Sequence, residues 1–289
     1  MPIPEDLPKA YRQYFTHQAP RSFSHRIVQY IKQGYLAHSH NRNAPSVSSV
    51  QKFFGLLAYA APFRRAGLDK LGEYLTSAPR GQLLDVGCGD GAILEYMQQQ
   101  GWQAEGLDFD PVAVERARAK GLKAQAGDLE SQHYPDASFA AIVMSHLIEH
   151  IHNPAGLLRE SYRILGTGGR LIVLTPNIQS WGHRRFGSAW YHLDPPRHLH
   201  LFTVPSLCVL LERAGYTKIT AATTLRNIRK IVSASRCIRR HGRYIPPGWR
   251  WPFSSLSVAS MEFAEWIAWK RDTMLGEEIG LIAEKQPKP

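Results

Sequence analysis

Three glycines that alternate with other residues after a short apolar run constrain the fold of this chain more than any other feature. Residues 83–94 read LLDVGCGDGAIL, with Gly87, Gly89 and Gly91 following the apolar run. Glycine lets a backbone turn sharply and approach a ligand without a Cβ in the way. A helix-compatible segment follows over residues 92–100, and a helix start offers unpaired N–H groups and a partial positive charge. The stretch therefore predicts a strand, a tight ligand-binding turn and a helix.

Two acidic residues near this turn indicate the chemistry of the ligand. Asp108 lies about 20 residues after the glycines, as in dinucleotide-binding turns, where an acidic residue accepts hydrogen bonds from a ribose. Asp85, however, lies two residues before Gly87, where it would set a carboxylate near a pyrophosphate. S-adenosylmethionine removes this conflict, because it carries an ammonium and a sulfonium group but no phosphate. We therefore expect S-adenosylmethionine as the cofactor and keep a nicotinamide dinucleotide as the alternative.

Strand and helix patterns alternate downstream of the turn. The expected strands cover residues 83–86, 104–107, 124–126, 139–144, 171–174, 218–223 and 278–285, and the expected helices cover 92–100, 111–120, 154–165 and 205–214. Alternation of this kind predicts an α/β fold, in which a parallel sheet carries helices on both faces. Ligands bind such sheets at the carboxyl ends of the strands.

Several of these segments together resemble the class I S-adenosylmethionine-dependent methyltransferases. The likeness runs in order through 83–94, GLDFDP at 106–111, AGDLE at 126–130, a segment ending SHLIEH at 139–150, and GGRLIVLTPN at 168–177. Within that family, the chain is most similar to the ubiquinone-biosynthesis O-methyltransferase-like group, methyltransferase types 11 and 23. The resemblance implies a doubly wound, seven-stranded, mostly parallel Rossmann-like sheet.

The expected cofactor contacts follow the carboxyl ends of the first four strands. Asp108 ends the second strand and would accept from both ribose hydroxyls, while Asp110 with Pro111 opens the next helix. By resemblance, Asp128 would accept from the adenine amino group. The full expected set is Asp85, Gly87, Gly89, Gly91, Asp108, Phe109, Asp128, Leu129 and Ser145.

A histidine-rich segment, SHLIEHIH, follows the fourth strand. Its spacing could place His146 and His150 on one helical face, but the zinc-binding order His-Glu-x-x-His is absent. Some of the resembled ubiquinone-pathway enzymes have a Glu-x-x-Glu-His run and a divalent ion, whereas here His146 stands at the first Glu position. We therefore expect no metal. We expect His146 to border the methyl end of the cofactor, and Glu149 and His150 to orient the loop.

Aromatic, basic and histidine side chains gather over residues 177–203, directly after the fifth strand. A loop at this edge of the sheet suits acceptor binding and proton removal. We expect Tyr191, Arg197 and His200 to contact the substrate. A hydroxyl acceptor needs a base, for which the candidates are His198 and, second, His146. Packing of a surface loop is the alternative interpretation of this stretch.

Four regions are expected along the chain: an N-terminal helical extension over 1–80, an S-adenosylmethionine-binding α/β core over 81–225, a helical insertion over 226–275, and the last strand with the tail over 276–289. The insertion would hold two helices, at about 226–240 and 254–274. The core of the resembled family turns tightly between its last two strands. Because this chain has an insertion at that place, the substrates of the resembled enzymes are a weaker guide to its own substrate.

The formal net charge of +11 is concentrated in two blocks without acidic residues. Residues 7–68 hold nine Lys or Arg and residues 224–250 hold eight. Such blocks favour anionic partners, although a solvated basic face has the same composition. For the insertion we keep three roles: peripheral membrane contact, a wall of the substrate pocket, and dimerisation. Nucleic acid is a less favoured partner, and the oligomeric state stays open.

Cys88, Cys208 and Cys237 are far apart and lack CxxC spacing, which favours a reducing, cytoplasmic setting over a disulfide framework.

We expect an enzyme that methylates an oxygen of a small-molecule acceptor of lipid-linked, sugar or quinol type. The alternatives are an RNA or protein methyltransferase that uses the basic surface, and a non-catalytic cofactor-binding scaffold.

Overall fold

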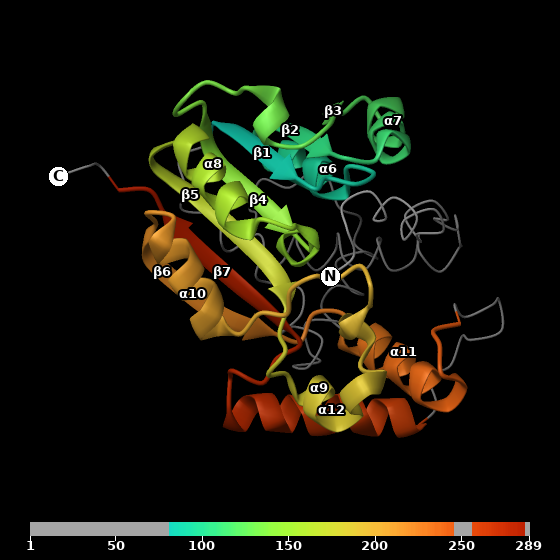
Figure 1. The fold of residues 1–289 in the computed structure, drawn as a ribbon. Helices are drawn as coiled ribbons and strands as arrows, with labels where there is room; N and C mark the ends of the chain where they lie inside the picture. The colour runs from blue at the N-terminus through green and yellow to red at the C-terminus, as the bar shows by residue number, and fades with distance from the viewer. Residues whose placement is uncertain (1–80, 246–255, 287–289) are drawn as a thin grey trace, which may run out of the picture.

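The computed structural model describes residues 81–245 and 256–286 of the 289-residue chain. These residues form one sheet with helices on both of its faces and a further group of helices beyond one end (Figure 1). The expected N-terminal helical extension lies outside the described residues. No helix in the described part of the chain is long and apolar enough to cross a membrane.

The sheet has seven strands in the order β3-β2-β1-β4-β5-β7-β6. Their bounds are Gln82–Val86 (β1), Gln103–Asp108 (β2), Lys123–Ala126 (β3), Phe139–Ser145 (β4), Leu165–Pro176 (β5), Thr217–Thr224 (β6) and Glu278–Glu284 (β7). The strands β1 to β5 pair in parallel, and β7 pairs antiparallel with both β5 and β6. The predicted doubly wound, mostly parallel α/β sheet is thereby confirmed.

Helices α6 (Ala92–Gln99) and α7 (Pro111–Ala119) cover one face of the sheet, and α8 (Pro154–Ile164) and α10 (Val204–Arg213) cover the other. Helix α7 begins as the sequence predicts, because Asp110 accepts the Val112 N–H at 3.0 Å and Pro111 occupies the first turn. Apolar side chains from both helix layers bury the strands. Because β1 to β5 pair in parallel, their carboxyl ends lie at one edge of the sheet.

A third helical group lies beyond the carboxyl ends of β4 and β5, at the bottom of Figure 1. It consists of α9 (Trp181–Phe186), α11 (Ile228–His241) and α12 (Leu256–Arg271). These helices share a separate apolar cluster that includes Trp190, Ile231, Val232 and Val258. Short 3-10 turns η3 (Glu130–Gln132), η4 (Ile148–His150), η5 (Gly187–Ala189) and η6 (Tyr191–Leu193) connect the layers.

Strand β5 differs most from its expected bounds, since it begins at Leu165 instead of residue 171. The added residues include GTGG, which lacks the apolar alternation of a strand. Backbone pairing with neighbouring strands determines the extension: Leu165 pairs with Phe139 on β4, and the Gly168 N–H donates to the Lys285 carbonyl at 2.7 Å. Helix α11 starts two residues later than expected, after Asn227 in a left-handed conformation.

Candidate functional site

The turn between β1 and α6 needs its three glycines for different reasons. Gly87, Gly89 and Gly91 have φ values of 80°, 53° and 83°, in the left-handed region that favours glycine. A Cβ on Gly91 would overlap a side-chain methyl of Leu122, whereas a Cβ on Gly89 would meet no described atom within 4 Å. The open side of Gly89 is therefore where a ligand can approach the backbone closely.

Asp108, the last residue of β2, connects this turn to the strand by a hydrogen bond. Its Oδ2 accepts the Gly89 N–H at 2.7 Å and its Oδ1 accepts the Asp110 N–H at 2.9 Å. Burial raises the pKa of Asp108, while these two backbone bonds oppose the rise. Each carboxylate oxygen has a second lone pair, so both oxygens can still accept from a pair of ligand hydroxyls. Asp110 is the cap of α7, which leaves Asp108 available for a ligand.

Asp85 lies at the end of β1 as a buried carboxyl group. Its side chain is fully buried, and neither oxygen accepts a hydrogen bond from the residues that the structure describes. Burial, and then the charge of Asp108, raise the pKa of Asp85 to about 8. A buried polar group without a partner is costly, and a nearby cation would favour its ionised form. The two neighbouring carboxyl groups of Asp85 and Asp108 therefore suit a ligand with cationic groups and not a pyrophosphate.

The other expected cofactor residues lie at the same edge of the sheet. Phe109 is 54% exposed beside Asp108. Asp128, after β3, uses one carboxylate oxygen to accept the Ser131 N–H at 2.8 Å, which is ordinary turn chemistry. Leu129 is buried, and Ser145 is the last residue of β4. The structure brings these side chains to one edge, and their individual contacts with the cofactor stay predictions.

His146 bridges two buried carboxylates. Its Nε2 lies 3.0 Å from Glu278 Oε1 and its Nδ1 lies 3.3 Å from Glu149 Oε1. Burial alone would lower the pKa of His146, but the two carboxylates outweigh burial and raise it to about 9. Burial would raise the pKa of each glutamate, yet the contact with His146 holds both at about 2. At neutral pH this is a charged imidazolium between two ionised carboxylates.

Glu149, His150 and His198 converge beside this bridge. His150 Nδ1 lies 3.1 Å from the Arg197 carbonyl and His198 Nδ1 lies 2.7 Å from the His192 carbonyl. Because a carbonyl only accepts, both Nδ1 atoms carry the proton, which makes Nε2 the basic atom of each ring. The three residues each offer a ligand atom within 4.8 Å of the others. Such a cluster can hold a proton or a metal ion; the expectation of no metal stays a prediction.

Backbone bonds lock the segment around residues 191–200 onto η4. The N–H groups of Leu199 and His200 donate to the Glu149 carbonyl at 2.7 Å and 3.1 Å. Arg197 Nε donates to Asp194 at 2.8 Å, so this guanidinium is held at the loop. Tyr191 is half-buried, and the Lys230 ammonium of α11 lies 5.4 Å from the centre of its ring. The two histidine-bearing segments of the sequence thus form one cluster with the start of the insertion.

Sequence reasoning missed two buried glutamates at the start of β7. Glu278 completes the His146 bridge, although it lies 132 residues away in the chain. Glu277 accepts the Gly182 N–H at 2.8 Å and the Trp190 indole N–H at 2.7 Å. The available signal was a pair of acidic residues at the start of an apolar strand, and acidic side chains are seldom buried.

Comparisons with known proteins show which proteins this chain is similar to. A family model described as a methyltransferase domain matches residues 57–221, more than half of the chain. A malonyl-[acyl-carrier protein] O-methyltransferase from Serratia marcescens is 28% identical over 157 residues, covering 54% of this chain and 61% of that protein. A ubiquinone biosynthesis O-methyltransferase from Xanthomonas oryzae pv. oryzae is 34% identical over 103 residues, covering 33% of this chain and 43% of that protein. The matches therefore span less than two thirds of each of these two relatives.

A solved structure shows the same fold. The crystal structure of an S-adenosylmethionine-dependent methyltransferase from Archaeoglobus fulgidus superposes with a TM-score of 0.52 at 18% identity. The superposition covers 80% of this chain and 93% of that one.

Proposed function

The chain belongs to the class I S-adenosylmethionine-dependent methyltransferases, and on this premise we propose that it methylates an oxygen atom of a small-molecule acceptor. S-adenosylmethionine supplies, when bound, a methyl group on a positively charged sulfur that is already a good leaving group. The protein's task is to hold the acceptor in line with that methyl group. The two O-methyltransferase relatives support oxygen as the accepting atom. A lipid-linked, sugar or quinol-type hydroxyl is the class of acceptor we favour.

The proposed cofactor site uses the edge formed by β1 to β4. Asp108 would accept from the ribose hydroxyls, Asp128 from the adenine amino group, and the Leu129 N–H would donate to a ring nitrogen. The carboxyl group of Asp85 would face the cationic part of the cofactor. Its burial without a hydrogen-bond partner among the described residues supports this role.

The contact between His198 Nδ1 and a backbone carbonyl is the observation that carries the proposed chemistry. Its Nδ1–H donates to the His192 carbonyl at 2.7 Å, so Nε2, which lies 4.0 Å from Asp194 Oδ2, carries the lone pair that can accept a proton. The ionised Glu149 of the same cluster would stabilise the imidazolium that forms. His146, the second candidate base, is already protonated at neutral pH. We propose that it keeps Glu149 and Glu278 ionised.

Tyr191, Arg197 and His200 are the proposed acceptor contacts, because they lie on the segment that holds His198. Arg197 is positioned by Asp194, and the His200 backbone is fixed to Glu149.

We place the enzyme in the cytoplasm, since its three widely separated cysteines are free thiols.

The test is a methyl-transfer assay that follows release of S-adenosylhomocysteine. Catechol and quinol compounds, hydroxylated sugars and a malonyl thioester are offered as acceptors, with bulk tRNA and a basic peptide alongside. We expect a methyl ether or ester as the product. A methylated RNA or peptide would favour the first alternative, and cofactor binding without transfer to any acceptor would favour a non-catalytic scaffold.

His198→Gln tests the base directly. We expect kcat to fall about 100- to 10,000-fold near neutral pH, as is usual when a general base is removed, while the affinity for S-adenosylmethionine stays unchanged. His241→Gln, at the exposed end of α11, is the matched control. Full activity of His198→Gln would exclude His198 as the base.

A further inference from the structure

We propose that the helical insertion formed by α11 and α12 docks on the anionic surface of a membrane. Its charge distribution is the first reason. Over residues 226–245 and 256–271, every Lys and Arg is at least partly exposed, and the only two acidic residues in these described ranges, Glu262 and Glu265, are buried. The cations are Arg226, Arg229, Lys230, Arg236, Arg239, Arg240, Arg243, Lys270 and Arg271. The first exposed acid after them is Asp272.

Internal contacts explain why the acidic side chains offset little of this charge. Glu262 lies 3.8 Å from Arg229 and is only 8% exposed. Glu265 is fully buried against Glu277 at the start of β7. Both carboxyl groups therefore point into the protein, and the surface of the insertion presents an excess of positive charge.

Apolar side chains among these cations distinguish a lipid surface from other anionic partners. Phe263, Ile245 and Met274 are 53%, 45% and 44% exposed, although large apolar side chains usually pack inside. The Lys270 ammonium lies 6.0 Å and 5.6 Å from the ring centres of Trp266 and Trp269. Exposed apolar side chains and cations that lie together on one part of a protein are typical of segments at a lipid surface, where apolar groups enter the headgroup layer and cations meet lipid phosphates.

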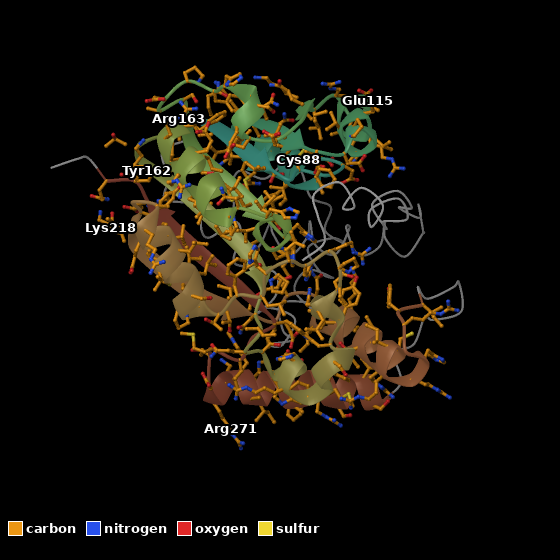
Figure 2. All side chains as sticks on the ribbon, viewed as in Figure 1. Cys88, Glu115, Tyr162, Arg163, Lys218 and Arg271 are labelled. Carbon is orange, nitrogen blue, oxygen red and sulfur yellow. The ribbon has the colours of Figure 1, made fainter. Side chains whose placement is uncertain are left out.

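The insertion also approaches the proposed acceptor site. Lys230 at the start of α11 lies over the ring of Tyr191, in the segment that carries His198. At the far end of α12, Arg271 points away from the body of the protein (Figure 2). A protein docked through these helices would hold the acceptor side of the site near the lipid surface. Membrane binding itself does not rest on the proposed methyl transfer.

The experiment is co-sedimentation of the full chain with two kinds of vesicle, phosphatidylcholine alone and phosphatidylcholine mixed with phosphatidylglycerol. We expect binding to the mixed vesicles only, weakened by added salt. Each Lys or Arg near an anionic membrane surface contributes about 1 kcal/mol to the free energy of binding. The double variant Arg240→Gln with Arg243→Gln should therefore bind about 30-fold more weakly. Phe263→Ser should lower binding as well, because it removes the exposed ring.

A double variant outside the insertion, Arg159→Gln with Arg213→Gln, is the matched control and should bind like the wild type. The affinity of every variant for S-adenosylmethionine reports correct folding, independently of any acceptor. Equal binding of the insertion variant and the wild type would overturn the proposal. Failure to bind either kind of vesicle would also overturn it, as would tight binding to tRNA without binding to vesicles.

Discussion

Replacing Asp108 with asparagine removes one negative charge from the proposed cofactor site while preserving the shape of the side chain. In the structure, each carboxylate oxygen accepts one backbone N–H, from Gly89 at 2.7 Å and from Asp110 at 2.9 Å. An asparagine side chain has only one oxygen. Its amide group must therefore face one of the two N–H donors, and neither orientation of the amide satisfies both.

The expected loss of cofactor affinity follows from the hydrogen bonds involved. A hydrogen bond to a charged group contributes about 1.5–3 kcal/mol, and asparagine loses the charge at both proposed ribose bonds. Taking one such bond as the net loss, the dissociation constant for S-adenosylmethionine should rise about 10- to 150-fold, since 1.4 kcal/mol is a factor of ten.

Calorimetric titration with S-adenosylmethionine measures this change. Asp110→Asn is the matched control, because it removes the same charge two residues away while asparagine remains a good helix cap. We expect near wild-type affinity for the control. If Asp108→Asn bound the cofactor as tightly as the wild type, or both variants lost affinity equally, Asp108 would not be the ribose acceptor.

Four further substitutions test other parts of the structure. Gly89→Ala should lower the free energy of unfolding by about 1 kcal/mol because of its left-handed φ, and should lose cofactor binding. Gly91→Ala should lower the melting temperature more, because its Cβ would also meet the buried Leu122. Lys285→Met should lower the free energy of unfolding in urea by about 2 kcal/mol, since the ammonium donates to three carbonyl groups at the end of α8 and the start of β5; no change would show that these bonds contribute nothing net. Burial raises the pKa of Glu265 beside Glu277, so the folded chain binds more protons and stability should fall as pH rises above about 4.3. Glu265→Gln should flatten that fall and raise the melting temperature above pH 7, and a steeper fall in the variant would contradict this assignment.

The local structure of the proposed cofactor site could be predicted because its residues are close together in sequence. The glycines of the first turn, Asp85 and the cap at Asp110 each follow directly from a strand end or a helix start. Positive φ values and helix caps impose requirements on single residues, so they leave a signal in a short stretch of sequence. The expectations for the segment over residues 1–80 fall outside the described residues.

The cluster that we propose as the acceptor side could be predicted only as two separate histidine-rich segments. Their juxtaposition depends on main-chain bonds from Leu199 and His200 to Glu149, which no periodicity reveals. The protonation state of His146 also escaped prediction. It was a candidate base from its residue type, and its charged state depends on carboxylates that approach it from two other parts of the chain.

The sequence by itself determined the order of strands and helices, the glycine turn and the choice of cofactor, because hydrophobic period and backbone conformation are properties of contiguous residues. The tertiary structure alone decided which buried charges meet. Strand β7 enters antiparallel between β5 and β6, and this placement brings Glu278 to His146 across 132 residues and Glu277 to Trp190 across 87. Electrostatic interactions of this kind depend on distance in space and on burial.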